Sequence, residues 1–586
     1  MTARTRRALR GLAIATAALL LSACTGLPTT GDVQRGNPLG ASPEGQDFLP
    51  LASDPVDGAG PEEIVEGFME AAITPADNWD TARRFLTPEL ASTWRPNTGV
   101  SIDVSAATRS FVSNVEDDSE AEDGDTADVR VAFDQIASVD ATGAYSEAFG
   151  ASNSAFVVER TKGQWRIAEA PDGVVIDESR FARVYDDYAL QYFDQTWERL
   201  VPDVRWFPRR ATVATTIAQS LIGGAPRPWL DPAVQSAFPQ EVQLARDAVP
   251  IDPDQIADVA LNRAALGLDP TTLARMRTQL QATLVAAGVQ IDQVRFTVDG
   301  RALEAGVVEV VTDTADAGSL VIKDGTFGML VGGEITPIPG VTDQILNAGQ
   351  PVTAIDVSVD SSRAAVQLID GHVWLAGDGG FDELDARPSL LRPSLDPYDY
   401  TWSVPSNAPA ALQAIGSDVA PQTIAGAWPE ASTVSAIRVS ADGARVAAVV
   451  VIGGERWIVV SSVIRDETGL PTELGPTEPI AQLDGSAVGL VWLGADRLGL
   501  LTDPGDRMVV TQVVGGPGET EVGPTGAVSI AGARAATGRP AGPRRRGCCV
   551  RANRVGVERI GHGSLASRHP SRSLSATASA RRACEG

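Results

Sequence analysis

Reactive and metal-binding side chains are scarce in this chain of 586 residues, which contains four cysteines and three histidines. Between residues 25 and 547 there is no cysteine, and His372 is the only histidine. Because disulfides and structural zinc sites need those side chains, we expect no metal site and no bound cofactor in that segment. Phosphate-loop and nucleophile-elbow motifs are also missing. The sequence therefore favours a protein that is not an enzyme.

Positive charge is scarce as well. Lys162 and Lys323 are the only lysines, and the formal net charge at pH 7 is −27. Residues 25–533 hold 73 acidic and 32 basic side chains, whereas residues 534–586 hold twelve arginines and two glutamates. An acidic surface of this kind repels nucleic acid and anionic lipid headgroups. We therefore expect no nucleic-acid partner.

The apolar run at the N-terminus is too short for a permanent membrane span. Gly11–Leu21 follows four arginines and is shorter than the roughly 20 residues that a bilayer requires. The small residues Ser22 and Ala23 suit a peptidase, and Cys24 follows them directly. We therefore expect a signal peptide over residues 1–23, which is removed between Ala23 and Cys24.

The segment Leu21–Cys24 resembles the lipobox of bacterial lipoproteins. The resemblance implies that Cys24 becomes an S-diacylglycerol cysteine and an N-palmitoyl cysteine. A thiolate suits this reaction because it is the strongest nucleophile among ordinary side chains. We expect the lipid to anchor the rest of the chain at the extracytoplasmic face of the cell membrane.

A flexible tether and a first domain follow the anchor. Residues 24–60 are rich in Pro, Gly, Asp and Ser, which predicts an extended linker. Over residues 61–175, Pro61 suits a first helical position, Ile64 and Phe68 recur at helical spacing, and strand-like alternation comes later. Helices followed by a curved antiparallel sheet form an α+β domain. This order resembles the NTF2-like fold.

Two further segments precede the C-terminal half. Residues 176–204 are part of the most aromatic stretch, and we interpret them as a linker that packs between domains. Residues 205–310 contain a helix ending near Gly223 and a second helix with an apolar stripe over Leu273–Leu284. Alternation over Val294–Val298 then leads into an Asp-Gly turn. That order resembles the GerMN domain, which implies an α/β unit.

Residues 311–530 predict a β-propeller. Short strands are punctuated by Asp-Gly pairs, and Ala354–Arg363 matches Ala436–Arg445 at a separation of 82 residues. Tyr400–Ser403 lies near the midpoint of that interval, and Leu490–Leu493 begins a further unit. A period of about 40 residues with several short strands is typical of propeller blades. A β-sandwich is the alternative.

The tail over residues 531–586 departs from these patterns, because it is basic and holds three of the four cysteines. We interpret it as a frame-shifted reading of the gene that leaves the propeller incomplete. A true disordered basic tail is the alternative. Its cysteines and histidines lack the spacing of a zinc site. They are Cys548, Cys549, His562, His569 and Cys584.

Two other candidate sites have simpler explanations. Seven acidic residues between Glu116 and Asp125 lack the ligand spacing and the glycine of an EF-hand calcium loop. They predict a solvated connection between strands. His372 follows the dipeptide Asp370-Gly371 and predicts a solvated turn residue rather than a catalytic base.

The whole arrangement resembles the LpqB family of actinobacterial lipoproteins over residues 1–530. The segments that carry the resemblance are Leu21–Pro28, Leu200–Asp203, Val294–Gly300 and Pro397–Ser403. The resemblance implies a partner, the extracytoplasmic sensor region of a two-component histidine kinase of the Mtr system. It implies no catalytic residues. The chain departs from the family pattern after residue 530.

Two functions are compatible with these observations. The first is a membrane-anchored lipoprotein that binds and modulates that kinase in cell-envelope and cell-division signalling. The second is an envelope ligand-binding module, for a glycan or a lipid, without a kinase role. The predicted fold class is multidomain, α+β and all-β, with an NTF2-like domain, a GerMN domain and a C-terminal β-propeller.

Overall fold

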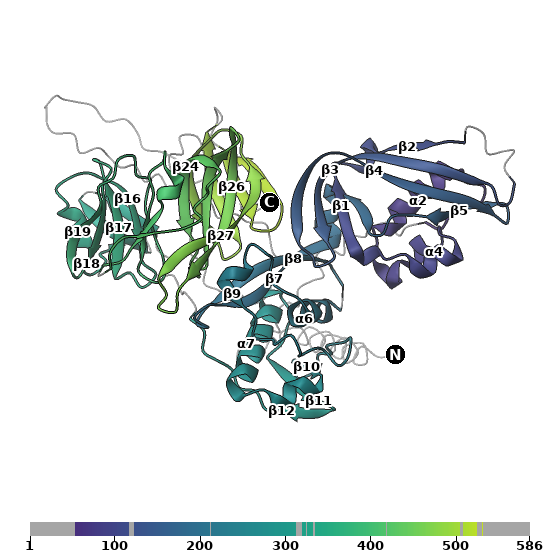
Figure 1. Ribbon diagram of the computed structural model, residues 1–586, viewed down its shortest axis with the longest axis horizontal. Helices are drawn as coiled ribbons and strands as arrows, with labels where there is room; N and C mark the ends of the chain where they lie inside the picture. The colour runs from purple at the N-terminus through teal and green to yellow at the C-terminus, as the bar shows by residue number, and fades with distance from the viewer. Residues whose placement is uncertain are drawn as a thin grey trace, which may run out of the picture. The chain divides into compact units, whose positions relative to one another are not determined.

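The computed structural model is rich in strands, which form eight sheets within the described residues (Figure 1). These residues are 53–115, 122–210, 212–311, 319–323, 325–331, 334–417, 419–503, 508–523 and 530. Cys24, most of the tether and the tail from residue 531 lie outside them. No helix in these ranges is both long enough and apolar enough to cross a membrane.

The first domain opens with three helices. They are α2 (Pro61–Ala72), α3 (Asp80–Arg83) and α4 (Pro88–Thr93). Pro61 occupies the first turn of α2, where its missing N–H costs no hydrogen bond. The Gly60 N–H donates to the Glu63 carboxylate at 3.2 Å and closes the start of the helix. Ile64 and Phe68 are buried, so the predicted helical spacing directs one face of α2 into the core.

A six-stranded sheet follows in the order β5-β4-β3-β1-β6, with β2 paired to β3. The strands are β1 (Gly99–Asp103), β2 (Ser110–Ser113), β3 (Thr126–Asp140), β4 (Tyr145–Thr161), β5 (Gln164–Glu169) and β6 (Val174–Asp177). All pairs are antiparallel except β1 with β6. Every second side chain from Ala127 to Phe133 is buried, as expected for a sheet with one face on a core. The predicted order of helices and then sheet is present, while the NTF2-like assignment stays a prediction.

Aromatic side chains fill the space between these helices and the sheet. The Phe68 ring centroid lies 5.1 Å from that of Trp94 and 6.1 Å from that of Phe156, in edge-on contacts. Trp79 is 2% exposed, and its Nε1 donates to the Ala72 carbonyl at 2.8 Å. The interior of the first domain is therefore packed with the protein's own side chains.

The segment expected to be an aromatic linker belongs instead to a folded domain. It forms helix α5 (Glu178–Val184) and enters the antiparallel hairpin of β7 (Tyr185–Asp194) and β8 (Leu200–Pro208). Tyr192 and Phe193 are fully buried. Aromatic residues serve strand cores as well as contacts between domains, so composition does not distinguish the two.

The second domain adds two helices and four strands to this hairpin. They are α6 (Val213–Gly223), β9 (Val234–Gln235), β10 (Ile256–Leu261), α7 (Pro270–Ala286), β11 (Gln293–Val298) and β12 (Arg301–Leu303). Strands β10 and β11 pair in parallel, and α7 connects them. Asp269 caps α7 by accepting bonds from the N–H groups of Thr271 and Thr272. Asp299 and Gly300 have positive φ, as the predicted turn between β11 and β12 requires.

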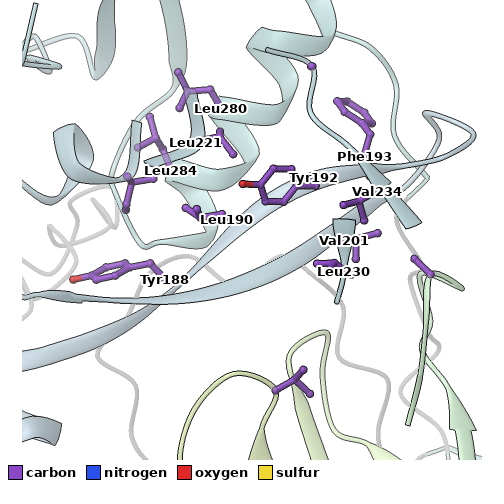
Figure 2. Close-up of a cluster of buried hydrophobic side chains, with 14 of the residues drawn as sticks. Tyr188, Leu190, Tyr192, Phe193, Val201, Leu221, Leu230, Val234, Leu280 and Leu284 are labelled. Carbon is purple, nitrogen blue, oxygen red and sulfur yellow. The ribbon is translucent and has the colours of Figure 1, made fainter. Parts of the chain in front are cut away.

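The core of the second domain lies between β7 and its helices, as Figure 2 shows. Leu280 and Leu284 on α7 are fully buried there, which confirms the predicted apolar stripe. Polar groups on the same helix bond to the β7 backbone. Thr283 Oγ1 accepts from the Gln191 N–H at 3.0 Å, and Gln279 Nε2 donates to the Gln191 carbonyl at 2.8 Å. Helix α7 is therefore fixed to β7 by both apolar and polar contacts.

Five successive antiparallel sheets follow in the described part of the chain beyond residue 318. The first contains β13 (Ser319–Lys323), β14 (Thr326–Val331) and β15 (Glu334–Thr336), followed by helix α8 (Thr342–Leu346). The second contains β16 (Val352–Val357), β17 (Arg363–Leu368), β18 (Val373–Gly377) and β19 (Gly380–Asp385). The third contains β20 (Ser394–Leu395), β21 (Thr401–Ser403), β22 (Gln413–Ile415) and β23 (Gln422–Thr423).

The last two of these sheets have the same plan. The fourth contains β24 (Ala431–Val439), β25 (Arg445–Ile452), β26 (Glu455–Arg465) and β27 (Pro471–Gln482). The fifth contains β28 (Ser486–Trp492), β29 (Arg497–Asp503), β30 (Met508–Val513) and β31 (Gly518–Val522). The first strands β16, β20, β24 and β28 contact one another in turn. Four-stranded meanders in this arrangement are typical of propeller blades.

The two matching sequence segments fold alike. Each contains the end of a first strand, a turn and the start of a second strand. Ser358 Oγ donates to Asp360 at 2.6 Å and accepts from the Arg363 N–H at 3.0 Å. Ser440 makes the same bonds, at 2.6 and 3.2 Å, with the residues two and five positions further on. The repeated sequence therefore corresponds to the same turn between the first and second strands of two sheets.

Truncating Leu280 tests the core of the second domain. Leu280→Ala should lower the free energy of unfolding of the full chain by about 2–5 kcal/mol, because loss of a buried leucine leaves a cavity. Val285→Ala on the same helix is the control, since Val285 is 53% exposed. That variant should stay within about 0.5 kcal/mol of the unmodified chain. Urea unfolding followed by tryptophan fluorescence measures both, and equal shifts of the transition midpoint would contradict this placement of Leu280.

Candidate functional site

One arginine, Arg227, bonds to the first domain, to the second domain and to the propeller sheets. Arg227 lies in the second domain, between α6 and β9. Its Nη2 donates to the Tyr145 carbonyl of the first domain at 3.0 Å and to Glu478 Oε1 on β27 at 2.8 Å. Its backbone N–H donates to Asp203 Oδ2 at 3.0 Å. We call this region, formed by Asp203, Arg205, Trp206, Arg227 and their partners, the domain junction.

The Asp203 carboxylate lies at the centre of the domain junction. Its Oδ2 accepts from Arg205 Nε at 3.1 Å and from Arg205 Nη2 at 2.7 Å, as well as from the Arg227 N–H. Arg205 Nη1 in turn donates to Thr142 Oγ1 of the first domain at 2.7 Å. Asp203, Arg205 and Arg227 are 2%, 4% and 6% exposed. Because these charges are buried, their partners are fixed by the protein and not replaced by water.

Trp206 adds an apolar contact beside these charges. Its ring centroid lies 6.1 Å from that of Tyr145 and 5.1 Å from that of Phe181. Its Nε1 donates to the Gly515 carbonyl of the fifth propeller sheet at 2.9 Å, and its backbone N–H donates to the Gly143 carbonyl at 2.8 Å. Trp206 on β8, two residues beyond the predicted linker of residues 176–204, therefore makes aromatic and polar contacts with the first domain and a hydrogen bond to the propeller sheets.

A second polar contact joins the second domain to the propeller sheets. Tyr398 donates its hydroxyl hydrogen to Asp194 Oδ2 at 2.6 Å. The Arg465 guanidinium lies 4.2 Å from the centroid of the Tyr398 ring, and the Arg465 N–H donates to Gln195 Oε1 at 3.0 Å. Burial raises the pKa of the Tyr398 phenol, and the bond to Asp194 raises it further. The phenol therefore remains a hydrogen-bond donor at neutral pH.

The space around this second contact is small. It measures about 210 Å³, open solvent included, and is lined by groups such as Thr196, Tyr398 and Arg465. No group of three or more His, Cys, Asp or Glu residues is placed to hold a metal ion in the described ranges. The bonds of Tyr398 and Arg465 with Asp194 and Gln195 join the propeller sheets to the second domain at this place.

The candidate residues from the sequence are dispersed. His372 lies in the turn between β17 and β18, as predicted, and its Nδ1 is 2.6 Å from Glu383 Oε1. From the acidic segment, Asp123 accepts a bond from the Gly163 N–H at 2.7 Å, and residues 116–121 lie outside the described residues. Cys24 and the cysteines and histidines of the tail lie outside them too, so their assignments stay predictions.

Sequence reasoning does not single out Arg227, Glu478 or Asp194. The motifs Leu200–Asp203 and Pro397–Ser403 each contribute one residue to the contacts between domains, but nothing local reveals their partners. Arg227 and Glu478 are 251 positions apart. Co-variation between the paired positions is the signal that could reveal such contacts.

Family models match the three domains in succession. "Lipoprotein LpqB, N-terminal domain" matches residues 54–182, "Sporulation and spore germination" matches 189–304, and "Lipoprotein LpqB beta-propeller domain" matches 318–543. The chain is therefore modular and strand-rich, with an N-terminal domain of the LpqB type, a GerMN-like second domain and a third domain of a β-propeller family.

Relatives match this chain over most of their length. The chain is 26% identical to Lipoprotein LpqB of Cutibacterium acnes, covering 90% of this chain and 92% of the relative. It is 28% identical to Lipoprotein LpqB of Streptomyces coelicolor, covering 76% and 78%. The chain belongs to the LpqB lipoprotein family.

Similarity to solved structures is limited to parts of the chain. The tandem GerMN domains of the sporulation protein GerM from Bacillus subtilis are 12% identical, covering 35% of this chain and 63% of that one. The TM-score is 0.18, which is too low to support an argument about the fold.

Removing Arg227 tests the charge balance of the domain junction. Burial raises the pKa of Glu478, and Arg227 opposes that shift. With a raised folded-state pKa, the stability that comes from the protonated carboxyl is present at low pH and is lost as the pH rises through that pKa. Arg227→Met should therefore destabilise the chain by about 1–3 kcal/mol at pH 7 and by less at pH 5. Thermal unfolding, referred to the unmodified chain at each pH, measures this difference.

The double variant Arg227→Met/Glu478→Gln is the matched control. It has no carboxylate at position 478, so the difference between the two pH values should largely disappear. An equal loss of stability at pH 5 and pH 7 in the single variant would contradict the proposed pairing of Arg227 with Glu478.

Proposed function

We propose that this protein is a membrane-anchored extracytoplasmic lipoprotein that binds and modulates a two-component sensor histidine kinase of the Mtr type. The observation that carries the proposal is the succession of LpqB-type domains behind the lipobox-like segment Leu21–Cys24. The kinase enters through the resemblance to the family.

In this proposal Cys24 carries the lipid anchor. Cleavage after Ala23 removes residues 1–23, and two or three acyl chains on Cys24 make retention stable. Asp54 and Gly58, within the predicted tether of residues 24–60, bond to Arg84 and Gln164 of the first domain. Residues 24–53 then allow a reach of up to roughly 100 Å when fully extended. Confinement to the membrane that holds the kinase raises the effective concentration of a weak contact. The acidic surface keeps the folded domains away from anionic headgroups.

The alternative, an envelope ligand-binding module for a glycan or a lipid, has less support from the first domain. That alternative requires an open interior in the NTF2-like fold that we assign to the domain. Phe68, Trp94 and Phe156 occupy the interior between helices and sheet, and all three are buried. We further propose that the protein is not an enzyme, in line with its membership of a lipoprotein family.

Replacing the lipidated residue tests the anchor. Cys24→Ser in the producing cell should move the protein from the membrane fraction to the soluble extracytoplasmic fraction, because serine cannot form the thioether to diacylglycerol. Cys548→Ser is the control and should remain with the membrane. Immunoblotting of the fractions measures the distribution, and a Cys24→Ser protein that stays in the membrane would overturn the anchoring proposal.

Capture of the kinase sensor region tests the partner. The purified full chain should enrich the kinase ectodomain several-fold over an unrelated lipoprotein in a pull-down. Arg227→Met should weaken capture because it loosens the domain junction, whereas the exposed substitution Val285→Ala should not. No enrichment by the unmodified chain would refute the kinase role and leave the anchoring proposal standing.

A further inference from the structure

The first strands of four propeller sheets have equivalent positions. The residue directly after each of these strands donates its N–H across the turn to a backbone carbonyl at the start of the second strand. These residues are Ser358, Asp396, Ser440 and Leu493. The residues four positions before these are Ala354, Arg392, Ala436 and Gly489. A shift in the strand register occurs directly before Ala354, Ala436 and Gly489, which confirms that these three residues are equivalent. Arg392, two residues before β20, is thus the residue that the third sheet has at this distance from the turn, where the other three sheets have alanine or glycine.

A second arginine lies beside Arg392 on the neighbouring first strand. Arg438 on β24 donates from Nη1 to the Pro393 carbonyl at 2.7 Å. The same Nη1 lies 3.8 Å from Asp356 Oδ2 on β16, and that oxygen also accepts from the Leu395 N–H at 2.9 Å. Arg438 and Asp356, on two of the first strands, thus lie against the chain at Pro393–Leu395, directly after Arg392. The Asp356 carboxylate already accepts from the Leu395 N–H and the Ser394 hydroxyl.

The charge of Arg392 is not balanced by the described residues. Its pKa is lowered, first by burial and second by the positive charge of Arg438. No hydrogen bond or ion pair joins Arg392 to any residue in the described part of the chain. The Arg392 side chain keeps solvent access, and Ala354 and Ala436 at the same level are half-buried. Among the residues that the structure describes, the Arg392 guanidinium is therefore unpaired, and Arg392 is exposed to solvent.

We propose that Arg392 and Arg438 form a binding site for an oxyanion, a phosphate or carboxylate group, where the first strands of the propeller sheets meet. Guanidinium groups bind both anions through paired N–H donors, and such charge-assisted bonds are the strong ones. Two neighbouring cations with one engaged carboxylate repel each other, and a bound anion removes that repulsion. The site stands out because residues 25–533 are so strongly acidic. It is independent of kinase binding.

Isothermal titration calorimetry of the purified full chain tests the site. The probes are inorganic phosphate, succinate and vesicles of phosphatidylglycerol, each compared with sodium chloride at equal ionic strength to remove general screening. We expect binding of at least one probe, with a Kd in the millimolar range or tighter. Arg392→Gln should weaken that binding about tenfold or more, since it removes the unpaired guanidinium. Arg246→Gln is the control, because Arg246 is an exposed arginine of the second domain.

The three probes distinguish the source of the anion. Binding of phosphate or succinate indicates a soluble anion, whereas binding of vesicles alone indicates a lipid headgroup. No binding of any probe by the unmodified chain would overturn the proposal, and so would equal binding by Arg392→Gln. The variant should keep the thermal midpoint of the unmodified chain, because Arg392 has no partner to lose. Arg392→Lys keeps the charge without the paired donors and should bind with intermediate affinity.

Discussion

The polar contacts between the three domains depend on the buried carboxylate of Asp203. It accepts from the Arg205 guanidinium and the Arg227 backbone, and these two arginines reach Thr142 of the first domain and Glu478 of the propeller sheets. A buried ion pair adds little net stability compared with apolar residues, yet an unpaired buried charge costs several kcal/mol. The domain junction therefore favours one pairing of domains over others more than it raises the total stability.

This specificity suits a protein that acts by recognition. At the domain junction Asp203 Oδ2 bonds to Arg205 and Arg227, while Asp203 Oδ1 is buried without a hydrogen-bond partner among the described residues. Tyr398 bonds to Asp194, and the Arg465 N–H bonds to Gln195. A lipid on Cys24 and a flexible tether would supply proximity to the membrane. The folded domains would supply the surfaces that a partner meets, and the unpaired Arg392 is one place where those surfaces are chemically distinctive.

The features that could be predicted from the sequence depend on near neighbours in the chain. The spacing of Ile64 and Phe68, the stripe on α7 and the repeated turn after Ser358 and Ser440 all follow from local periodicity or local hydrogen bonds. The β7–β8 hairpin was not predictable, because aromatic composition fits a strand core and a linker equally. The contact of Arg227 with Glu478 was not predictable either, since no local rule links residues 251 positions apart.

The distance between the first domain and the propeller in solution tests this account most directly. The distance can be measured between spin labels at Val112 and Ile369, which are 60% and 62% exposed. The labels are placed in a full chain in which the native cysteines are replaced by serine. With Arg227 intact, double electron–electron resonance should give one narrow distribution, and Arg227→Met should broaden it. A broad distribution with Arg227 intact would contradict the claim that the domain junction fixes the pairing of the domains.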